Sequence, residues 1–268
     1  DENIDGNEKT ALVKNTVGDN TGDNISAKNR SYNELTAAYY AWKNLDSDYY
    51  GLTHYRRTFV FDETKTKKYF RIKRIEDLPK KSLYSRDKPA DMLNRYDFIA
   101  PKPIKTASVY EHYEKAHDVN DLEAIRKIIE SRFKEYARAA DRYLFGSQEY
   151  LYNMFVFDKP TFFRYCEFVF GVLKEAESRF VGKRMFVSER LTGIFITELL
   201  LEGKKGLFLP TIFAAEKEKL SSAVERTKKS LALRRETGKK GFGSLVYALK
   251  PLLEKLLPNF VFDIYKNR

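Results

Sequence analysis

Two arginines and a histidine close a predicted strand in the run His54-Tyr55-Arg56-Arg57. In open α/β sheets, ligands bind beyond the carboxyl ends of strands, and arginine offers paired donors to phosphate oxygens. The run therefore predicts an anion-binding site. Alternation along the strand predicts that His54 and Arg56 share one face, with Tyr55 and Arg57 on the other. The alternative interpretation is a solvated strand end whose arginines pair with neighbouring carboxylates.

A carboxylate and an amide are the next candidates for chemistry. Glu189 lies between Ser188 and Arg190 at the predicted start of a helix, where backbone N–H groups favour anions. Glu189 is the carboxylate best placed to serve as a general base, and a helix-capping role is equally open. Asn153 interrupts an apolar strand predicted over residues 151–157, so we expect it either to be hydrogen-bonded within the sheet or to contact a ligand.

A loop rich in Asp, Asn, Gly and Ser runs from residue 19 to residue 29. Short polar side chains with glycine form loops whose amide and backbone groups can hold a polar ligand. A turn-rich connector explains the same composition equally well. A metal site built on two histidines of one helix is not favoured, because His112 and His117 are five residues apart and do not share a helix face.

These groups must be positioned by alternating strands and helices. Residues 1–30 are predicted as loop and residues 65–91 as an irregular basic stretch, and apolar periodicity predicts the remaining elements. The expected strands span residues 49–61, 96–100, 151–157 and 206–213, and the expected helices span residues 33–44, 108–117, 121–144, 159–177 and 188–201. This alternation predicts an α/β fold with a mixed central sheet flanked by helices.

Composition excludes several classes of protein. The 268 residues are 43% hydrophobic and 15% aromatic, which excludes an intrinsically disordered chain. No apolar run reaches the roughly 20 residues that a membrane-spanning helix needs. The single cysteine, Cys166, excludes disulfides within the chain and zinc sites built on several thiolates. The polar, acidic first residues predict no signal peptide, and together these features predict a cytoplasmic protein.

The net charge of +11 is carried mainly by the last part of the chain. Residues 221–268 hold eleven Lys and Arg against four Asp and Glu, so this segment supplies +7. We therefore predict a globular domain over residues 1–220 and a basic helical tail over residues 221–268. Within the tail, residues 242–257 repeat apolar side chains beside two lysines, a pattern typical of a helix bound to an anionic membrane surface. A helix docked on the domain is the alternative.

A basic nucleic-acid-binding protein is the rival from another class, because basic residues interleaved with Tyr and Phe can stack on single strands. Against it, the charge of residues 1–220 is close to neutral and the sequence carries no recognised nucleic-acid-binding signature. We therefore expect no nucleic acid partner.

Several motifs, taken together, resemble one family. They are Thr21-Gly22-Asp23-Asn24-Ile25-Ser26 with Asn29, Glu34-Leu35-Thr36, Trp42-Lys43-Asn44, Gly51-Leu52-x-His54-Tyr55-Arg56-Arg57, Tyr152-Asn153-Met154-Phe155 and Ser188-Glu189-Arg190-Leu191. With these motifs the chain resembles, over residues 18–215, the bacterial capsular polysaccharide biosynthesis family, first defined as a domain of unknown function, whose characterised members are galactofuranosyltransferases of O-antigen and capsule assembly. The resemblance implies a GT-A-like glycosyltransferase fold. It also implies transfer of galactofuranose or another hexose from a UDP-sugar to a lipid-linked or oligosaccharide acceptor at the inner face of the cell membrane.

The resemblance also implies roles for individual residues. Glu189 is the expected catalytic base, with Asp23 as the second choice. His54-Tyr55-Arg56 occupies the place where related transferases carry a metal-binding Asp-x-Asp motif, so we expect a metal-independent reaction. Asp46-Ser47-Asp48 matches that motif but precedes its strand, which favours a turn; manganese or magnesium would require Asp46 and Asp48. A non-catalytic sugar-nucleotide-binding module is the alternative. The expected donor-binding residues are Gly22, Asp23, Asn24, Ser26, Asn29, His54, Tyr55, Arg56, Arg57, Asn153 and Arg190.

Overall fold

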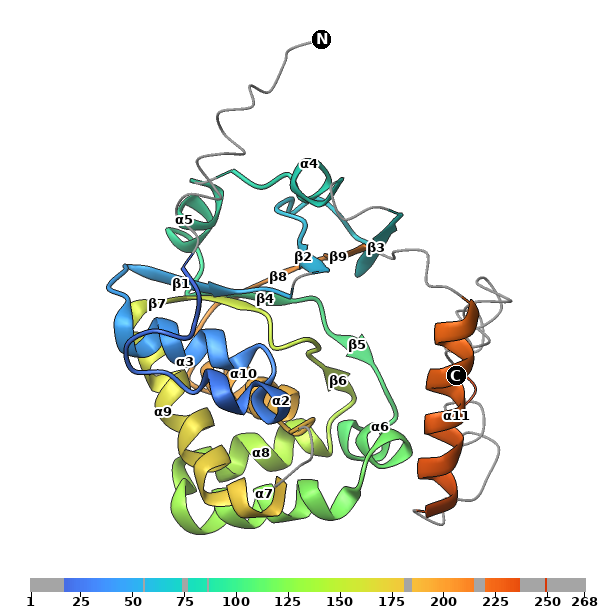
Figure 1. The fold of residues 1–268 in the computed structure, drawn as a ribbon. Helices are drawn as coiled ribbons and strands as arrows, with labels where there is room; N and C mark the ends of the chain where they lie inside the picture. Colours follow the sequence, from blue (N-terminus) through green and yellow to red (C-terminus); the bar gives the residue numbers. More distant parts are fainter. Residues whose placement is uncertain are drawn as a thin grey trace.

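The structure is a computed structural model that describes residues 17–54, 56–73, 77–85, 87–180, 185–214, 220–236 and 249. Its centre is a four-stranded sheet in the order β1-β7-β4-β8 (Figure 1). β7 (Phe155–Asp158) pairs antiparallel with β1 (Tyr49–Leu52) and with β4 (Phe98–Pro101), whereas β8 (Gly206–Leu209) runs parallel to β4. The sheet is mixed and flanked by helices, which confirms the predicted fold class.

Helices cover one face of this sheet and form the main core with it (Figure 1). Successive residues of β7 point to opposite faces, so Phe155 and Phe157 are buried against the helices and Val156 against the other layer. The helical layer contains η1 (Ser26–Lys28), α2 (Asn29–Tyr32), α3 (Leu35–Asn44), α6 (Val109–Ala116), α7 (Val119–Arg132), η3 (Lys134–Tyr136), α8 (Ala137–Leu144), α9 (Lys159–Ala176), η4 (Glu177–Phe180) and α10 (Ser188–Leu201).

A smaller layer packs on the opposite face of the central sheet. Its three-stranded sheet has the order β2-β9-β3, and Phe59 of β2 shares a core with Ile99 of β4 and Val156 of β7. The elements of this layer are β2 (Arg57–Phe59), β3 (Tyr69–Ile72), α4 (Leu78–Ser82), α5 (Lys88–Leu93) and β9 (Thr211–Ala214). A two-stranded ribbon of β5 (Ile104–Lys105) and β6 (Gln148–Glu149) connects the central sheet to α6 and α8.

Two predicted strands prove to be two strands each, and the prediction was wrong there. Residues 49–61 form β1 in the central sheet and β2 in the second sheet. The break has a simple cause: β7 begins at Phe155, opposite Leu52, so the chain beyond Leu52 has no partner in the central sheet. Residues 206–213 divide in the same way at Pro210, which separates β8 from β9.

Other differences concern boundaries. The helix predicted over residues 121–144 is interrupted at Phe133, whose ring packs against Gly171 of α9 so closely that a Cβ there would lie 2.7 Å away. The stretch over residues 65–91 contains β3, α4 and the start of α5 rather than irregular chain alone. Asn153 precedes β7 instead of lying inside it.

The basic tail is described only in its first part. α11 (Leu220–Glu236) begins next to the predicted domain boundary at residue 221, and the division into two parts stays a prediction. The predicted amphipathic segment over residues 242–257 lies, apart from Leu249, outside the described residues. Among the helices of the described residues, none combines the length and the apolar character needed to cross a membrane.

Candidate active site

Glu189 lies in the first turn of α10, and its side chain is 31% exposed. The residue that caps this helix is Val187, without a side-chain hydrogen bond, and the Glu189 carboxylate instead accepts a hydrogen bond of 3.3 Å from Arg190. Burial raises the pKa of Glu189, and the nearby carboxylates of Glu34 and Glu149 raise it further, whereas Arg190 and Arg57 act against this rise. A carboxylate with raised proton affinity that still reaches solvent has the properties of a general base.

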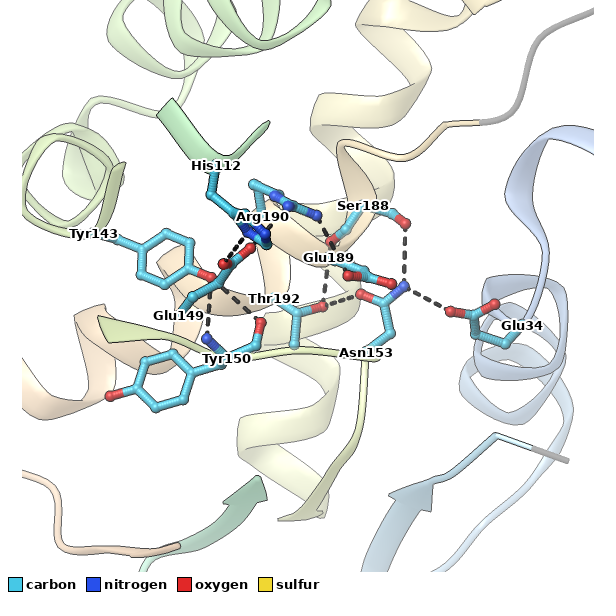
Figure 2. A network of polar contacts seen from close by, with 10 residues as sticks. All are labelled: Glu34, His112, Tyr143, Glu149, Tyr150, Asn153, Ser188, Glu189, Arg190 and Thr192. Atoms are coloured by element: carbon cyan, nitrogen blue, oxygen red, sulfur yellow. Dashed lines mark hydrogen bonds and ion pairs between the residues drawn. The ribbon is translucent and has the colours of Figure 1, made fainter. Parts of the chain in front are cut away.

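Asn153 joins the start of α10 to the start of α3 (Figure 2). Its amide nitrogen donates to Glu34 Oε1 at 2.9 Å and to Ser188 Oγ at 3.1 Å, and its amide oxygen accepts a bond of 2.7 Å from Thr192 Oγ1. Its side chain is therefore satisfied by protein groups. The backbone reaches this position through two consecutive residues of positive φ, +80° at Tyr152 and +50° at Asn153. Asparagine tolerates that conformation better than other non-glycine residues do.

Arg57 and His54 face each other across the turn that separates β1 from β2. The backbone N–H of each donates to the carbonyl of the other, at 2.9 and 3.1 Å. The Arg57 guanidinium lies 4.5 Å from the ring centre of Tyr152 and 4.6 Å from that of Phe213. The two aromatic rings therefore restrict the position of the Arg57 guanidinium, so its positive charge is held in a fixed place. His54 and Arg57 pair as antiparallel neighbours, so the prediction that they lie on opposite faces of one continuous strand was wrong.

His54 contributes a hydrogen-bond donor rather than a charge. Burial lowers the pKa of His54, and so do Arg57 and Arg56, whereas Glu34 partly opposes the shift. The imidazole is therefore neutral at neutral pH. Its Nδ1 accepts a bond of 3.4 Å from the backbone N–H of Arg56, which assigns the proton to Nε2. Arg56 itself lies with its guanidinium 5.7 Å from the Phe213 ring centre, and Tyr55 falls outside the described residues.

The loop that contains Gly22, Asp23, Asn24 and Ser26 lies at the other end of α3. Asn44, the last residue of α3, accepts from the backbone N–H of Asp23 at 3.1 Å and donates to its carbonyl at 2.7 Å. Glu34 precedes the same helix, whose ten residues span about 15 Å. The structure therefore does not bring Asp23 beside Glu189. Asn29 lies nearer the start of α3, where its amide donates to Thr36 Oγ1 at 3.1 Å.

Asp46 and Asp48 precede β1, whereas His54 follows it. Asp46 accepts a hydrogen bond of 2.5 Å from Lys159, and the Asp48 carbonyl accepts one of 2.9 Å from the backbone N–H of Lys159. These contacts join the start of β1 to the start of α9. The arrangement does not fit a cation held beside His54, because both carboxylates lie at the opposite end of the strand.

The polar and charged side chains grouped around Glu189 are called the Glu189 cluster below; they belong to Glu34, His54, Arg57, His112, Glu149, Asn153, Ser188, Arg190 and Thr192. Several of these residues were not identified as site residues from the sequence. Glu34 was noted only within a motif, and Glu149 was not noted at all, although it is fully buried. His112 was considered only as a metal ligand, yet its Nδ1 lies 2.5 Å from Glu149 Oε2. The one signal for Glu149 is a carboxylate placed next to the aromatic residues that follow it, which is too weak to predict burial.

Comparisons with known proteins agree with this architecture. A family model described as "Domain of unknown function (DUF4422)" matches residues 4–203. Among solved structures, the apo structure of the WbbM bifunctional glycosyltransferase is similar, with a TM-score of 0.66 and 31% sequence identity over 74% of this chain. The match covers 39% of that protein, so this chain spans well under half of its length. No curated protein matches the sequence.

Proposed function

The chain belongs to the DUF4422 family, and from this premise we propose that it is a glycosyltransferase that moves galactofuranose or another hexose from a UDP-sugar to a glycan acceptor. The likeness to the WbbM bifunctional glycosyltransferase supports the class of reaction. The observation that carries the proposal is a partly exposed carboxylate of raised pKa, Glu189, grouped with the cationic Arg57 and the neutral His54. This combination pairs a proton acceptor with donors for a phosphate leaving group.

The proposed reaction is an inverting displacement. Glu189 takes the proton of the acceptor hydroxyl while the oxygen of that hydroxyl forms a bond to the anomeric carbon of the donor. The bond from that carbon to the diphosphate oxygen breaks, and the electron pair leaves on UDP. The Arg57 guanidinium and the Nε2–H of His54 donate to the diphosphate and stabilise its charge. Arg190 does not reach the donor in this proposal, because its guanidinium is engaged by Glu149 and Glu189.

No metal takes part in the proposed reaction. The positive charge of Arg57 supports this part, together with the position of Asp46 and Asp48 at the far end of β1. Turnover that persists in EDTA is the expected result. Activity abolished by EDTA and restored by manganese would overturn metal independence without overturning glycosyl transfer.

The basic tail is proposed to hold the enzyme at an anionic membrane, where a lipid-linked acceptor would be available. Basic residues gather in α11, and a lysine or arginine near anionic lipid contributes about 1 kcal/mol to membrane binding. The measurement is flotation with liposomes of anionic lipid, using the full chain and a chain without residues 221–268. Equal flotation of both would contradict this role.

The decisive experiment measures UDP release from UDP-galactofuranose, UDP-galactose and UDP-glucose, with and without an oligosaccharide acceptor. The expected result is acceptor-dependent release from one donor, together with a rise in melting temperature in the presence of UDP. Stabilisation by UDP-sugars without any turnover would instead identify a non-catalytic binding module. If UDP and the UDP-sugars neither stabilise the protein nor are turned over, the proposed function is overturned.

A further inference from the structure

Glu149 is a fully buried carboxylate behind the candidate active site (Figure 2). A buried charge is tolerated only when it is paired and hydrogen-bonded. Glu149 has two such partners: Arg190 Nη2 donates to its Oε1 at 2.8 Å, and His112 Nδ1 lies 2.5 Å from its Oε2. These partners come from α10 and α6, whereas Glu149 belongs to β6, so three elements meet at this one carboxylate.

Arg190 is shared between two carboxylates of different exposure. One end of its guanidinium bonds to buried Glu149 at 2.8 Å, and the other reaches partly exposed Glu189 at 3.3 Å. The ring of Tyr113 lies 5.0 Å from the guanidinium carbon and packs against it. Because arginine is a planar fork, the shorter bond to Glu149 determines how the second end is presented to Glu189. The side chain of Arg190 is 6% exposed, which leaves it little freedom to turn elsewhere.

We propose that Glu149 is a positioning residue that, through Arg190, sets the direction and the ionisation of Glu189. The inference rests on the proposed function for the role of Glu189 as a base, but the coupling between the two carboxylates does not depend on it. Glu149 also acts on Glu189 directly, because a nearby carboxylate disfavours the charged form of Glu189.

The groups that face Glu189 come from several elements and must all be considered. Glu34 and Glu149 favour its protonated form, and Arg190 and Arg57 favour its charged form. Tyr152 and Tyr143 are further titratable neighbours of Glu189 among the described residues. Removal of the charge on Glu149 takes away one repulsion and leaves Arg190 with Glu189 as its remaining carboxylate partner. Both changes favour the charged form of Glu189, so they act in the same direction.

The test follows the ionisation of Glu189 directly by carbon NMR of the full chain labelled at glutamate Cδ. The Glu189 resonance is identified by its loss in Glu189→Gln. In Glu149→Gln we expect the titration midpoint of Glu189 to fall by roughly 1 pH unit. The matched control is Glu202→Gln, which removes a carboxylate bonded to Arg164 at 2.8 and 2.9 Å at the opposite end of α10, and which should leave the midpoint unchanged.

A second variant covers the case in which Glu149→Gln does not fold, as judged by circular dichroism. Arg190→Lys keeps one charge, but a single ammonium cannot serve both carboxylates as a fork does. It should remain with buried Glu149, so the midpoint of Glu189 should rise. An unchanged Glu189 midpoint in whichever variant folds would overturn the inference.

Kinetics separate this inference from the proposed function. If transfer is observed, the acid limb of the pH–rate profile should move with the NMR midpoint, and kcat at neutral pH should fall about threefold to tenfold in Glu149→Gln while KM for the donor stays constant. Coupled titrations in a protein without transferase activity would support the inference and contradict the proposed function. Glycosyl transfer by a protein in which the titration of Glu189 does not depend on Glu149 would support the proposed function and contradict the inference.

Discussion

Two regions at opposite ends of α3 share the expectation of ligand binding, and they are built in different ways. The cluster around Glu189 draws polar side chains from the start of α3, the turn before β2, the segment before β7, and α10. The loop around Asn24 bonds mainly to itself: the Asn24 amide donates to the Gly22 carbonyl at 2.9 Å, and its oxygen accepts from Ser26 Oγ at 2.8 Å. Hydrogen bonds also join Asp23 of the loop to Tyr39 and Asn44 of α3.

The difference shows how far a structural role alone explains the polar residues of each region. In the loop, the Asn24 amide bonds to the backbone two residues away on either side, donating to the Gly22 carbonyl and accepting from the Ser26 N–H. This is the behaviour of a turn-forming residue, so the composition of the loop is explained without a ligand. In the Glu189 cluster, buried charges are brought together from distant parts of the chain, which costs free energy that a purely structural role would avoid. The cluster is therefore the better candidate for chemistry, and variants of both regions can break or sharpen this contrast.

The largest effect is expected for Glu189→Gln. Loss of a general base lowers turnover by about 10²–10⁴-fold, whereas donor binding should change little because the base touches the acceptor. The measurement is kcat together with donor affinity from calorimetry, with Glu202→Gln as the matched control. Turnover close to that of the unaltered chain would assign the base to another residue.

Asn153→Ala should destabilise the protein more than Asn24→Ala. Asn153 is buried and bonds to Glu34, Ser188 and Thr192, so its loss leaves buried groups unsatisfied in a left-handed backbone, at about 2–4 kcal/mol in all. Asn24 is half-buried in the loop and bonds to Gly22 and Ser26, and its loss should cost at most about 1 kcal/mol. Thermal melts of the two variants provide the comparison. Equal shifts would remove the structural contrast between the two regions.

Arg57→Ala should weaken donor binding by about tenfold to a hundredfold, because a hydrogen bond to a charged group contributes about 1.5–3 kcal/mol. Arg56→Ala should also weaken it. The matched control is Arg95→Ala, since Arg95 pairs with Glu63 at 3.3 Å and has no contact with the cluster. UDP titration by calorimetry measures the effect. An unchanged affinity in Arg57→Ala would place the diphosphate elsewhere.

Gly22→Ala tests the loop itself. Gly22 has φ of +59°, and a Cβ there would lie 2.1 Å from Asn44 Oδ1, so the alanine both strains the backbone and displaces Asn44. The expected loss is about 1–2 kcal/mol of stability. Donor affinity should fall as well if the loop binds the donor. Lower stability with unchanged affinity would leave the loop with a structural role only.

The smallest expected effect is a pH-dependent gain of stability in Glu189→Gln. The pKa of Glu189 is raised in the folded protein, so the native state binds more protons than the unfolded chain between the ordinary carboxyl pKa and the raised one. Stability contributed by Glu189 is therefore lost as pH rises through this window. The variant should melt above the unaltered chain at pH 7 and level with it at pH 4. A lower melting temperature at pH 7 would contradict the burial of an unfavourable charge.

The sequence predicted most of the elements and part of the site. Apolar periodicity located α3, α9 and α10 closely, because each buries one face against the sheet over several turns. It missed the break after Leu52 and the break at Pro210, because a continuous apolar run does not reveal where a strand changes its partner. It singled out His54, Arg57, Asn153 and Glu189 by residue type, but not what surrounds them.

The sequence by itself determined the α/β class, the concentration of positive charge after residue 220 and the residue types able to bind a phosphate or accept a proton. Only the tertiary structure decided which of those residues meet. Glu34 and Glu189 are far apart in the chain, yet the Asn153 amide bonds both to Glu34 and to Ser188, the residue before Glu189. The tertiary structure also decided that His54 is neutral and that Glu149 is buried. Desolvation and the field of nearby charges depend on three-dimensional packing and leave no local pattern in a sequence.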